Sequence, residues 1–420
     1  MFWLIENKEQ FREFCSKGFR EAFVEIIPNN PFQHPIKNSI CAFYVRPIGD
    51  RKGYILPFTH SECGSLFEDE VYVYLKGLET IYVRDKKEFL HYTILKQLID
   101  ITLALPPYIP PQTTAHTILY SRFPNMLTIN QLVPITKHYE VCEQIYDDLE
   151  HRVNTAVNPF YNNIATLVFN AIERNGIKID KNEFENHFQR IQEEPFVFTS
   201  YNFKTLTTRP SNKFDGINYA ALPKENGCRK SFIPRNDIFV EYDISAYHPT
   251  LSGQLVGFDF GDQDIHRSFA SMYGVDYAKA KELTFKQLYG GVFEQYKDLD
   301  FFKLTSEYIR TIWEKYETEG KLICPISNHE FKRDELENMN PQKLFNYVLQ
   351  NMETSVNIKI LYRILKLLKN KQTKLVLYTY DSFLFDFAKG EEDVMEQIKS
   401  VFSELKLYIK IKNGISYDFR

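Results

Sequence analysis

Residues 374–387 read KLVLYTYDSFLFDF, and this stretch decides the fold of the C-terminal half of the chain. Apolar and aromatic side chains fill both of its halves, and a polar turn at Tyr380–Ser382 divides them. Apolar runs on either side of a tight turn predict two buried strands joined as a hairpin. Two further strand patterns, IFVEYDIS at 238–245 and KLYIKI at 406–411, predict neighbours for this hairpin in one sheet.

Helical patterns flank these strands. They cover residues 149–175, where Gly176 ends the pattern, and also residues 264–289, 341–369 and about 391–405. The short IKID segment (177–180) predicts an extended piece, and the polar stretch from there to Pro234 is expected to be irregular.

Residues 1–150 predict short strands mixed with helices. AFVEII (22–27) reads as a strand, and SICAFYVRPI (39–48) with KGYILPF (52–58) reads as a hairpin. EFLHYTILKQLIDITL (88–103) predicts a helix, and the prolines of LPPYIPPQTT (105–114) predict a loop.

The composition indicates a well-packed soluble protein of two or three subdomains. The chain has 420 residues, of which 44% are hydrophobic and 15% aromatic. Its net charge of −4 gives no overall attraction to a polyanion, so nucleic-acid binding would need a locally basic groove. The six cysteines are far apart in the sequence, with no pattern for zinc or a disulfide scaffold, and no apolar run of about 18 residues occurs. We therefore expect a soluble protein in a reducing cytoplasm.

Two aspartates have the settings that phosphoryl transfer requires. Asp243 ends the apolar strand at 238–245, and Asp381 lies at the turn of the hairpin. A charge is costly in such positions unless it is paired or bound to a metal, and carboxylates from two strands can hold the two Mg²⁺ ions used in nucleotidyl transfer. Each aspartate alone has a plainer explanation, since Asp is common where strands turn.

A second candidate group lies on the helix around 277–290. Lys281, Phe285 and Tyr289 are spaced four residues apart and therefore share one face, and Gly290 and Gly291 end the helix. The face would pack two rings inward beside a solvated lysine, or it would place a cation and two rings against a nucleoside triphosphate.

The pattern around Lys281 resembles motif B of the family A, or DNA polymerase I-like, polymerases. Asp243-Ile244-Ser245 is similar to motif A of that family, and Tyr380-Asp381-Ser382 is similar to motif C. Further segments resemble the family in the same order along residues 172–385: IERNGIKID (172–180), TTRPS (207–211), NYAALP (218–223), RKSFIP (229–234), DIHRSFA (264–270) and FNYVLQNMETS (345–355).

The resemblance implies an α+β fold of the right-hand polymerase kind. It implies a degenerate 3′–5′ exonuclease-like domain of the RNase H-like α/β type at 1–150, a reduced thumb and the start of the palm at 151–235, and a palm at 236–420 with fingers inserted at about 255–335. The partners implied are primer–template DNA and deoxynucleoside triphosphates.

The resemblance also implies roles for matching residues. Asp243 and Asp381 would hold two Mg²⁺ ions, with the backbone carbonyl of Ile244 completing one coordination shell. The incoming nucleotide would meet His266, Lys281, Phe285, Tyr289 and His248. Primer–template would contact Arg209, Asn346 and Gln350.

The chain departs from the family pattern at several of these positions. Ser382 stands where the family has Glu, which is closer to single-subunit RNA polymerases, and His248 stands where the DNA enzymes carry a sugar-selecting Glu. Tyr277 replaces an expected Arg. Fewer than 30 residues separate IKID from TTRPS, too few for the family's long thumb hairpin, so we expect low processivity or a partner protein that supplies the grip.

In the N-terminal part, the metal-binding acids of the exonuclease pattern are missing. The chain reads Phe23-Val24-Glu25-Ile26 where the family has two acids, and a later acid falls on Phe89. We expect no proofreading, unless Asp85 or Asp100 serves instead. The compact size and the Lys, Asn, Ile, Phe and Tyr content are typical of a phage or mobile element, and the location would then be the host cytoplasm.

Three functions remain open from the sequence. The first is a DNA polymerase working by two-metal phosphoryl transfer. The second is an RNA polymerase or primase of the same fold, and the third is a catalytically silent, polymerase-shaped replication subunit that binds DNA.

Overall fold

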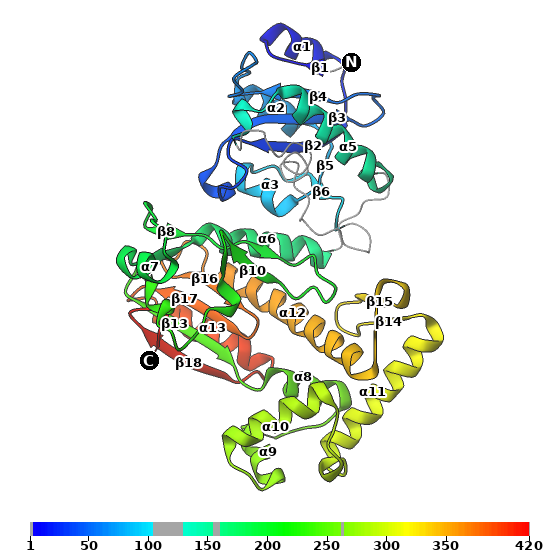
Figure 1. Cartoon of the computed structure of the whole chain (residues 1–420), viewed down its shortest axis with the longest axis vertical. Coiled ribbons are helices and arrows are strands. Elements are labelled where there is room, and N and C mark those ends of the chain that lie inside the picture. Colours follow the sequence, from blue (N-terminus) through cyan, green and yellow to red (C-terminus); the bar gives the residue numbers. More distant parts are fainter. Residues whose placement is uncertain (1–2, 104–128, 154–159, 262–263, 420) are drawn as a thin grey trace. The chain divides into compact units, whose positions relative to one another are not determined.

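The computed structural model describes residues 3–103, 129–153, 160–261 and 264–419. Its contacts divide the chain into two compact units, Met1–Arg174 and Asn175–Arg420 (Figure 1). Among the described residues, no helix combines the length and the apolar character that a membrane span needs.

The N-terminal unit is built on a six-stranded sheet in the order β1-β4-β3-β2-β5-β6. Strands β2, β3 and β4 pair antiparallel, whereas β5 and β6 continue parallel to β2. The strands are β1 (Trp3–Leu4), β2 (Glu21–Pro28), β3 (Ile40–Pro47), β4 (Tyr54–Pro57), β5 (Thr80–Val83) and β6 (Leu98–Asp100). The expected strand at 22–27 and the expected hairpin at 39–58 are confirmed.

Helices cover both faces of this sheet because alternate residues of each strand point to opposite sides. Val24 packs in a core with α1 (Lys8–Ser16), α2 (Glu68–Gly77) and α3 (Lys86–Tyr92). Its neighbour Phe23 packs in a second core with α5 (Ile135–Val153).

The helix expected at 88–103 is wrong in its second half. Helix α3 ends at Tyr92, and residues 98–100 form the edge strand β6. The carboxylate of Asp100 accepts hydrogen bonds from the backbone N–H groups of Lys86 and Thr102, which fixes this end of the strand. A short apolar run such as LIDI fits a strand as well as a helix, so its period cannot decide between them. The loop expected at 105–114 lies outside the described residues.

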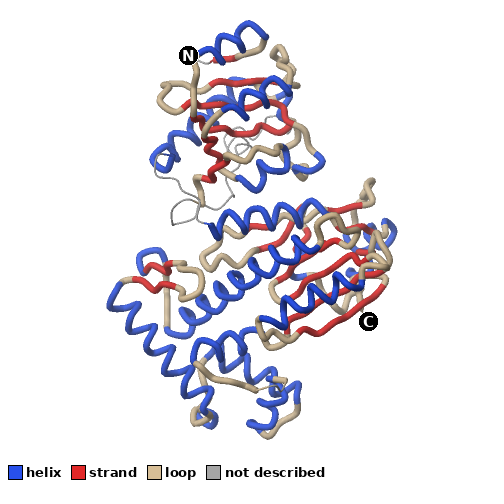
Figure 2. The backbone as a smooth tube through the Cα atoms, turned by 180° about the vertical axis from the view of Figure 1, so that it is seen from behind, coloured by secondary structure: helices blue, strands red, loops and turns tan. Residues whose placement is uncertain are grey.

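The C-terminal unit contains a four-stranded antiparallel sheet in the order β16-β17-β13-β18. The sheet lies at one side of this unit (Figure 2). Strands β16 (Lys374–Thr379) and β17 (Ser382–Phe387) are the expected hairpin, and β13 (Ile238–Ile244) is the expected strand beside it. The last strand, β18, covers Ile409–Gly414 and not 406–411, because Lys406 takes a left-handed conformation just after α13 (Glu392–Glu404) ends.

Strand alternation gives this sheet one apolar face and one polar face. The ring of Tyr242 packs against Phe385 and against Phe402 of α13, which covers the apolar face. Asp243 belongs to the opposite face, where its partners across the sheet are Ser382 and Lys410. The sheet therefore displays Asp243 on the side away from α13.

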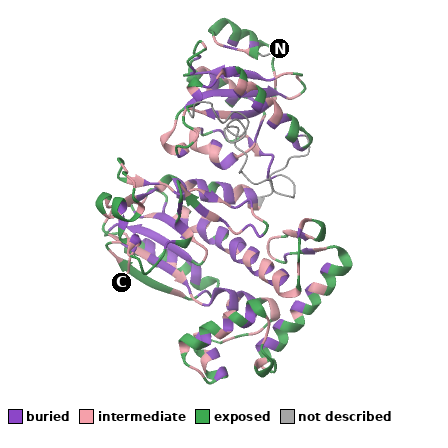
Figure 3. Cartoon of the chain, in the orientation of Figure 1, coloured by how far each residue is buried: buried purple, intermediate pink, exposed green. Residues whose placement is uncertain are grey.

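The chain between β13 and α12 (Pro341–Leu367) is mostly helical. It contains α8 (Tyr247–Val256), α9 (Ile265–Tyr273), α10 (Tyr277–Gly290), α11 (Asp300–Glu319) and the small hairpin β14 (Lys321–Ile323) and β15 (Glu330–Lys332). The helix expected at 264–289 is two helices, because Gly274 ends α9 with a φ of 66° and Asp276 caps α10. Helix α12 is largely buried, whereas the outer faces of α9 to α11 are exposed (Figure 3).

The segment 177–234 is more regular than its polar composition predicts. It contains α7 (Lys181–Phe188) and the short strands β7 (Ile177–Ile179), β8 (Phe196–Val197), β9 (Tyr201–Asn202), β10 (Ser211–Phe214), β11 (Ile217–Asn218) and β12 (Phe232–Ile233). Strand β7 pairs with β8 and β12, so the order comes from partners distant in sequence. The helix expected at 149–175 is α6 (Phe160–Asn175) over its described C-terminal part.

Candidate active site

Asp243 and Asp381 lie at the same end of two paired strands. Asp243 is opposite Ser382 in the β13–β17 register, and Asp381 immediately precedes Ser382. The backbone N–H of Ile244 donates to the backbone carbonyl of Asp381 over 2.8 Å, which extends the ladder to the turn. The geometry therefore brings together the two carboxylates that the sequence singled out.

The protein environment disfavours the ionised form of both carboxylates. Withdrawal from water raises the pKa of Asp381 to about 6, and the nearby charges of Asp243 and Glu353 add to the rise. Burial likewise raises the pKa of Asp243, against the lowering effect of Lys412. The side chain of Asp381 is nevertheless exposed at the surface. A ligand can therefore reach this carboxylate, although the surrounding protein and the other carboxylates disfavour its ionised form.

These donors fit magnesium. Two carboxylates and the backbone carbonyl of Ile244 offer hard oxygen ligands, which Mg²⁺ prefers. A divalent cation would also relieve the repulsion that raises the pKa of Asp381.

The turn before Asp381 holds a residue in an unusual conformation. Tyr380 has a φ of 60°, which is costly for a large side chain. Its carbonyl accepts a 2.6 Å hydrogen bond from Asn357 Nδ2, and the Arg209 guanidinium stacks 3.6 Å above its ring. Contacts from α12 and from the 207–211 segment thus hold the turn in place.

A chain of polar contacts links Tyr289 to Arg209 through a buried carboxylate. The Tyr289 hydroxyl lies 2.6 Å from His248 Nδ1, and His248 Nε2 lies 3.0 Å from Glu353 Oε2. Arg209 Nε forms an ion pair with the same Glu353 oxygen at 3.1 Å. Glu353 is 2% exposed and lies on α12, and the sequence reasoning missed it because nothing in the local pattern marks a buried acid.

Helix α10 presents the expected face of one cation and two rings. Phe285 and Tyr289 stack with ring centroids 5.8 Å apart, and His266 of α9 lies 5.9 Å from Phe285. Lys281 is exposed, and its positive charge acts to lower the pKa of Asp243, while the charge of Asp381 acts to raise the pKa of Tyr289. This face therefore lies within electrostatic range of both carboxylates.

His266 is neutral near pH 7. Burial lowers its pKa to about 4, and the positive charge of Lys281 contributes. Its Nδ1 atom has no hydrogen-bond partner among the described residues. A neutral imidazole offers a hydrogen bond to a triphosphate, but no positive charge.

Asn346 and Gln350 lie one turn apart on α12. Gln350 Oε1 accepts a 3.1 Å hydrogen bond from Thr207, which belongs to the segment carrying Arg209. Asn346 Nδ2 lies 3.5 Å from the backbone carbonyl of Tyr289. Gln350 thus connects α12 to the 207–211 segment, and Asn346 connects α12 to the end of α10.

Tyr277 of α10, which stands where the resemblance expects Arg, binds a lysine of strand β18. Its hydroxyl accepts a 2.9 Å hydrogen bond from Lys410 Nζ, and Lys410 pairs with Asp243 in the β13–β18 register. Strand β18 therefore brings Lys410 and also Lys412 to the carboxylates, a feature that the sequence reasoning missed.

The acids considered for an exonuclease site have other partners in the N-terminal unit. Glu25 forms a buried ion pair with Arg84, and Asp85 caps α3 through the backbone N–H of Glu88. Asp100 accepts hydrogen bonds from Thr102 and from the backbone N–H of Lys86. Phe89 is a core residue.

Another polar cluster of this unit, His34, His91 and Glu173, has donor atoms close enough to hold a metal. Both Glu173 oxygens accept from Lys87 Nζ, at 2.8 and 3.0 Å. The Lys87 charge therefore already balances this carboxylate.

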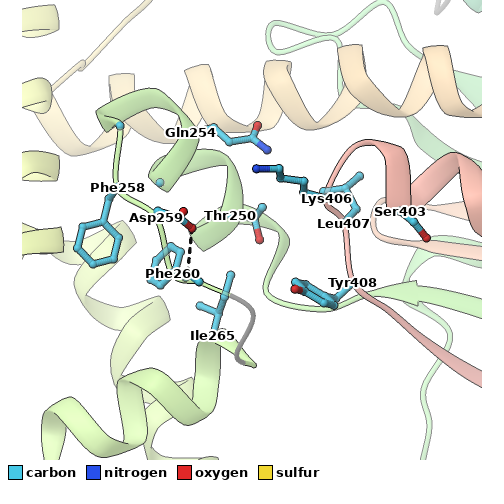
Figure 4. A pocket seen from close by; sticks show the side chains of 13 residues that line it. Thr250, Gln254, Phe258, Asp259, Phe260, Ile265, Ser403, Lys406, Leu407 and Tyr408 are labelled. Atoms are coloured by element: carbon cyan, nitrogen blue, oxygen red, sulfur yellow. Dashed lines mark hydrogen bonds between the residues drawn. The ribbon is translucent and has the colours of Figure 1, made fainter.

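A cavity of about 710 Å³ lies in the C-terminal unit beside α8 and the end of α13. Gln254 and Lys406 point toward one another in it, with Phe258 and Tyr408 among its other walls (Figure 4). None of the site residues that the sequence predicts lines this cavity.

No family model matches the sequence, and no curated protein matches it. Among solved structures, the chain is similar to the POL domain of Pol1 from M. smegmatis, determined in complex with DNA primer–template and dNTP. The TM-score is 0.70 over 99% of both chains, at 12% sequence identity. The expected α+β fold with palm and fingers is therefore confirmed.

Proposed function

We propose that the chain is a template-directed DNA polymerase that adds deoxynucleotides to a primer 3′-OH. The observation that carries this proposal is the pair Asp243 and Asp381, held at one end of paired strands beside the cation-and-ring face of α10. The primer–template and dNTP bound to the similar solved domain agree with it.

In the proposed reaction, Asp243, Asp381 and the Ile244 carbonyl would hold two Mg²⁺ ions. The chemistry supplied by ions held there would be activation of the 3′-OH and neutralisation of the departing pyrophosphate. Lys281 pairs with the triphosphate, and His266 donates a hydrogen bond to it.

The remaining candidate residues position the two substrates. Phe285 and Tyr289 offer ring faces to the new base pair, and His248 crowds the sugar at its 2′ position. Primer–template lies along Arg209, Asn346 and Gln350, because a guanidinium suits a backbone phosphate and amides suit minor-groove acceptors.

Primer extension with Asp243→Ala and Asp381→Ala tests the proposal. Each variant should lose extension by at least about a thousandfold, because a two-metal site cannot form with one carboxylate. Asp386→Asn is the matched control, since Asp386 is a buried carboxylate of the same sheet paired with Arg235 at 3.2 Å. Wild-type-like extension by either alanine variant would refute the site.

RNA synthesis is the second candidate, and Ser382 beside Asp381 is the observation that favours it. The wild-type enzyme supplied only with ribonucleotides decides between the two. A catalytically silent subunit would incorporate neither kind of nucleotide, even with enzyme in excess.

The proposal extends to the rest of the chain. The ion pair of Glu25 with Arg84 supports an N-terminal unit that does not proofread, since an arginine rather than a metal balances that acid. The short chain between Lys181 and Leu206 supports low processivity or a replisome partner. A phage or mobile-element origin remains part of this proposal.

A further inference from the structure

Glu241 lies on the same face of β13 as Asp243, because the two residues are two positions apart in one strand. It is only 3% exposed, and both of its carboxylate oxygens are engaged. Ser382 Oγ donates to Oε1 over 2.8 Å, and Lys412 Nζ donates to Oε2 over 2.7 Å. Glu241 is therefore a buried, fully bonded acid adjacent to the proposed metal site.

Lys412 lies between two carboxylates. Its ammonium is 2.7 Å from Glu241 and 3.9 Å from Asp243 Oδ2. The side chain is 42% exposed, so it has room to move, and strand pairing places its backbone opposite Glu241. The ammonium therefore rests closer to Glu241 than to Asp243.

An ammonium and a divalent cation compete for the same carboxylate oxygens. At 3.9 Å, Lys412 leaves Asp243 without a direct hydrogen bond from it. Without the charge of Glu241, Asp243 becomes its nearest carboxylate, and the attraction grows as the separation shortens. A direct Lys412–Asp243 ion pair would then occupy an oxygen that the metal needs.

We propose that Glu241 is a positioning residue that, tethered by Ser382, holds Lys412 away from Asp243 and so keeps this carboxylate available to a divalent cation. The inference rests on the proposed function, because it takes Asp243 to be a metal ligand. It assigns a role to the serine that follows Asp381, since Ser382 orients the acid that restrains the lysine.

Four variants test this restraint: Glu241→Gln, Lys412→Gln, the double variant of both, and Asp386→Asn as the control that removes a buried carboxylate elsewhere in the sheet. The first readout is Mn²⁺ binding to the protein without DNA or nucleotide, followed by the loss of the free-ion electron paramagnetic resonance signal. The second is the Mg²⁺ concentration needed for half-maximal primer extension. Thermal unfolding of every variant reports whether it is folded.

Glu241→Gln should weaken Mn²⁺ binding roughly tenfold, as the freed lysine moves onto Asp243. Lys412→Gln should bind at least as tightly as wild type, and the double variant should recover most of the loss. This recovery is the decisive result, because a merely structural role for Glu241 predicts a double variant no better than the single one. If Glu241→Gln does not fold, Mn²⁺ binding by Lys412→Gln that is at least as tight as in wild type still supports the restraint, and weaker binding overturns it.

Two results would overturn the inference while leaving the proposed function intact: unchanged Mn²⁺ binding by a folded Glu241→Gln, or a double variant that binds as weakly as Glu241→Gln. Failure of the proposed function looks different. In that case the wild-type protein neither extends primers nor binds Mn²⁺ in a manner that Asp243→Ala abolishes.

Discussion

At the scale of single residues, the metal-binding role proposed for Asp381 requires an ionised carboxylate, whereas the folded protein favours its protonated form. Its pKa in the folded protein is raised to about 6, above the value of about 3.9 for an unperturbed aspartate. A raised carboxyl pKa means that the folded state holds the proton more tightly than the unfolded state does. The stabilisation from protonation is complete below the unfolded pKa and is lost as the pH rises through about 6.

Asp381→Asn should therefore raise the thermal unfolding temperature at pH 8 without divalent ions. The difference from wild type should shrink as the pH falls through about 6 and should vanish below about pH 4. Added Mg²⁺ should stabilise the wild-type protein but have a smaller effect on the variant. Scanning unfolding from pH 4 to 8 checks this, and a variant less stable than wild type at pH 8 would contradict it.

At the scale of elements, the predictions succeeded where the local pattern is strong. The runs at 238–245 and 374–387 are apolar enough, and the turn at Tyr380 tight enough, to indicate paired strands without knowledge of the rest. The 177–234 segment failed because its short strands depend on distant partners, as when Phe232 pairs with Ile179. The roles of Glu353 and Glu241 could not be predicted for the same reason. Each acid becomes buried and finds its hydrogen-bond partners only when α12 and β18 pack against the other elements.

Helix α12 contacts both α8 and the 207–211 segment through Glu353, which binds His248 and Arg209. Glu353→Gln removes the charge that orients His248, whose other nitrogen meets the Tyr289 hydroxyl. We expect the preference for deoxynucleotides over ribonucleotides to fall about tenfold, comparable to the loss of one charge-assisted hydrogen bond. Single-nucleotide incorporation with separate kcat and KM values measures it, and Asp386→Asn should keep the wild-type preference. An unchanged preference in folded Glu353→Gln would show that His248 needs no support.

At the scale of the whole molecule, we expect a low affinity for primer–template DNA. The net charge is −4, so retention depends on local contacts. All residues between Lys181 and Leu206 are described, and within this range α7, with eight residues, is the only helix. No long helical hairpin is present there to close over a duplex, and few phosphates should be neutralised.

Binding of primer–template should therefore be weak, and it should depend only moderately on salt. Fewer than about six neutralised phosphates would give a slope of log affinity against log salt shallower than about −5. Fluorescence anisotropy in about 50 to 200 mM KCl measures the slope, and extension in the presence of excess trap DNA measures how far one binding event carries synthesis. We expect only a few nucleotides per event. A steeper slope together with long products would mean that residues outside the 181–206 segment neutralise more phosphates than expected, and the expected need for a partner protein would then be wrong.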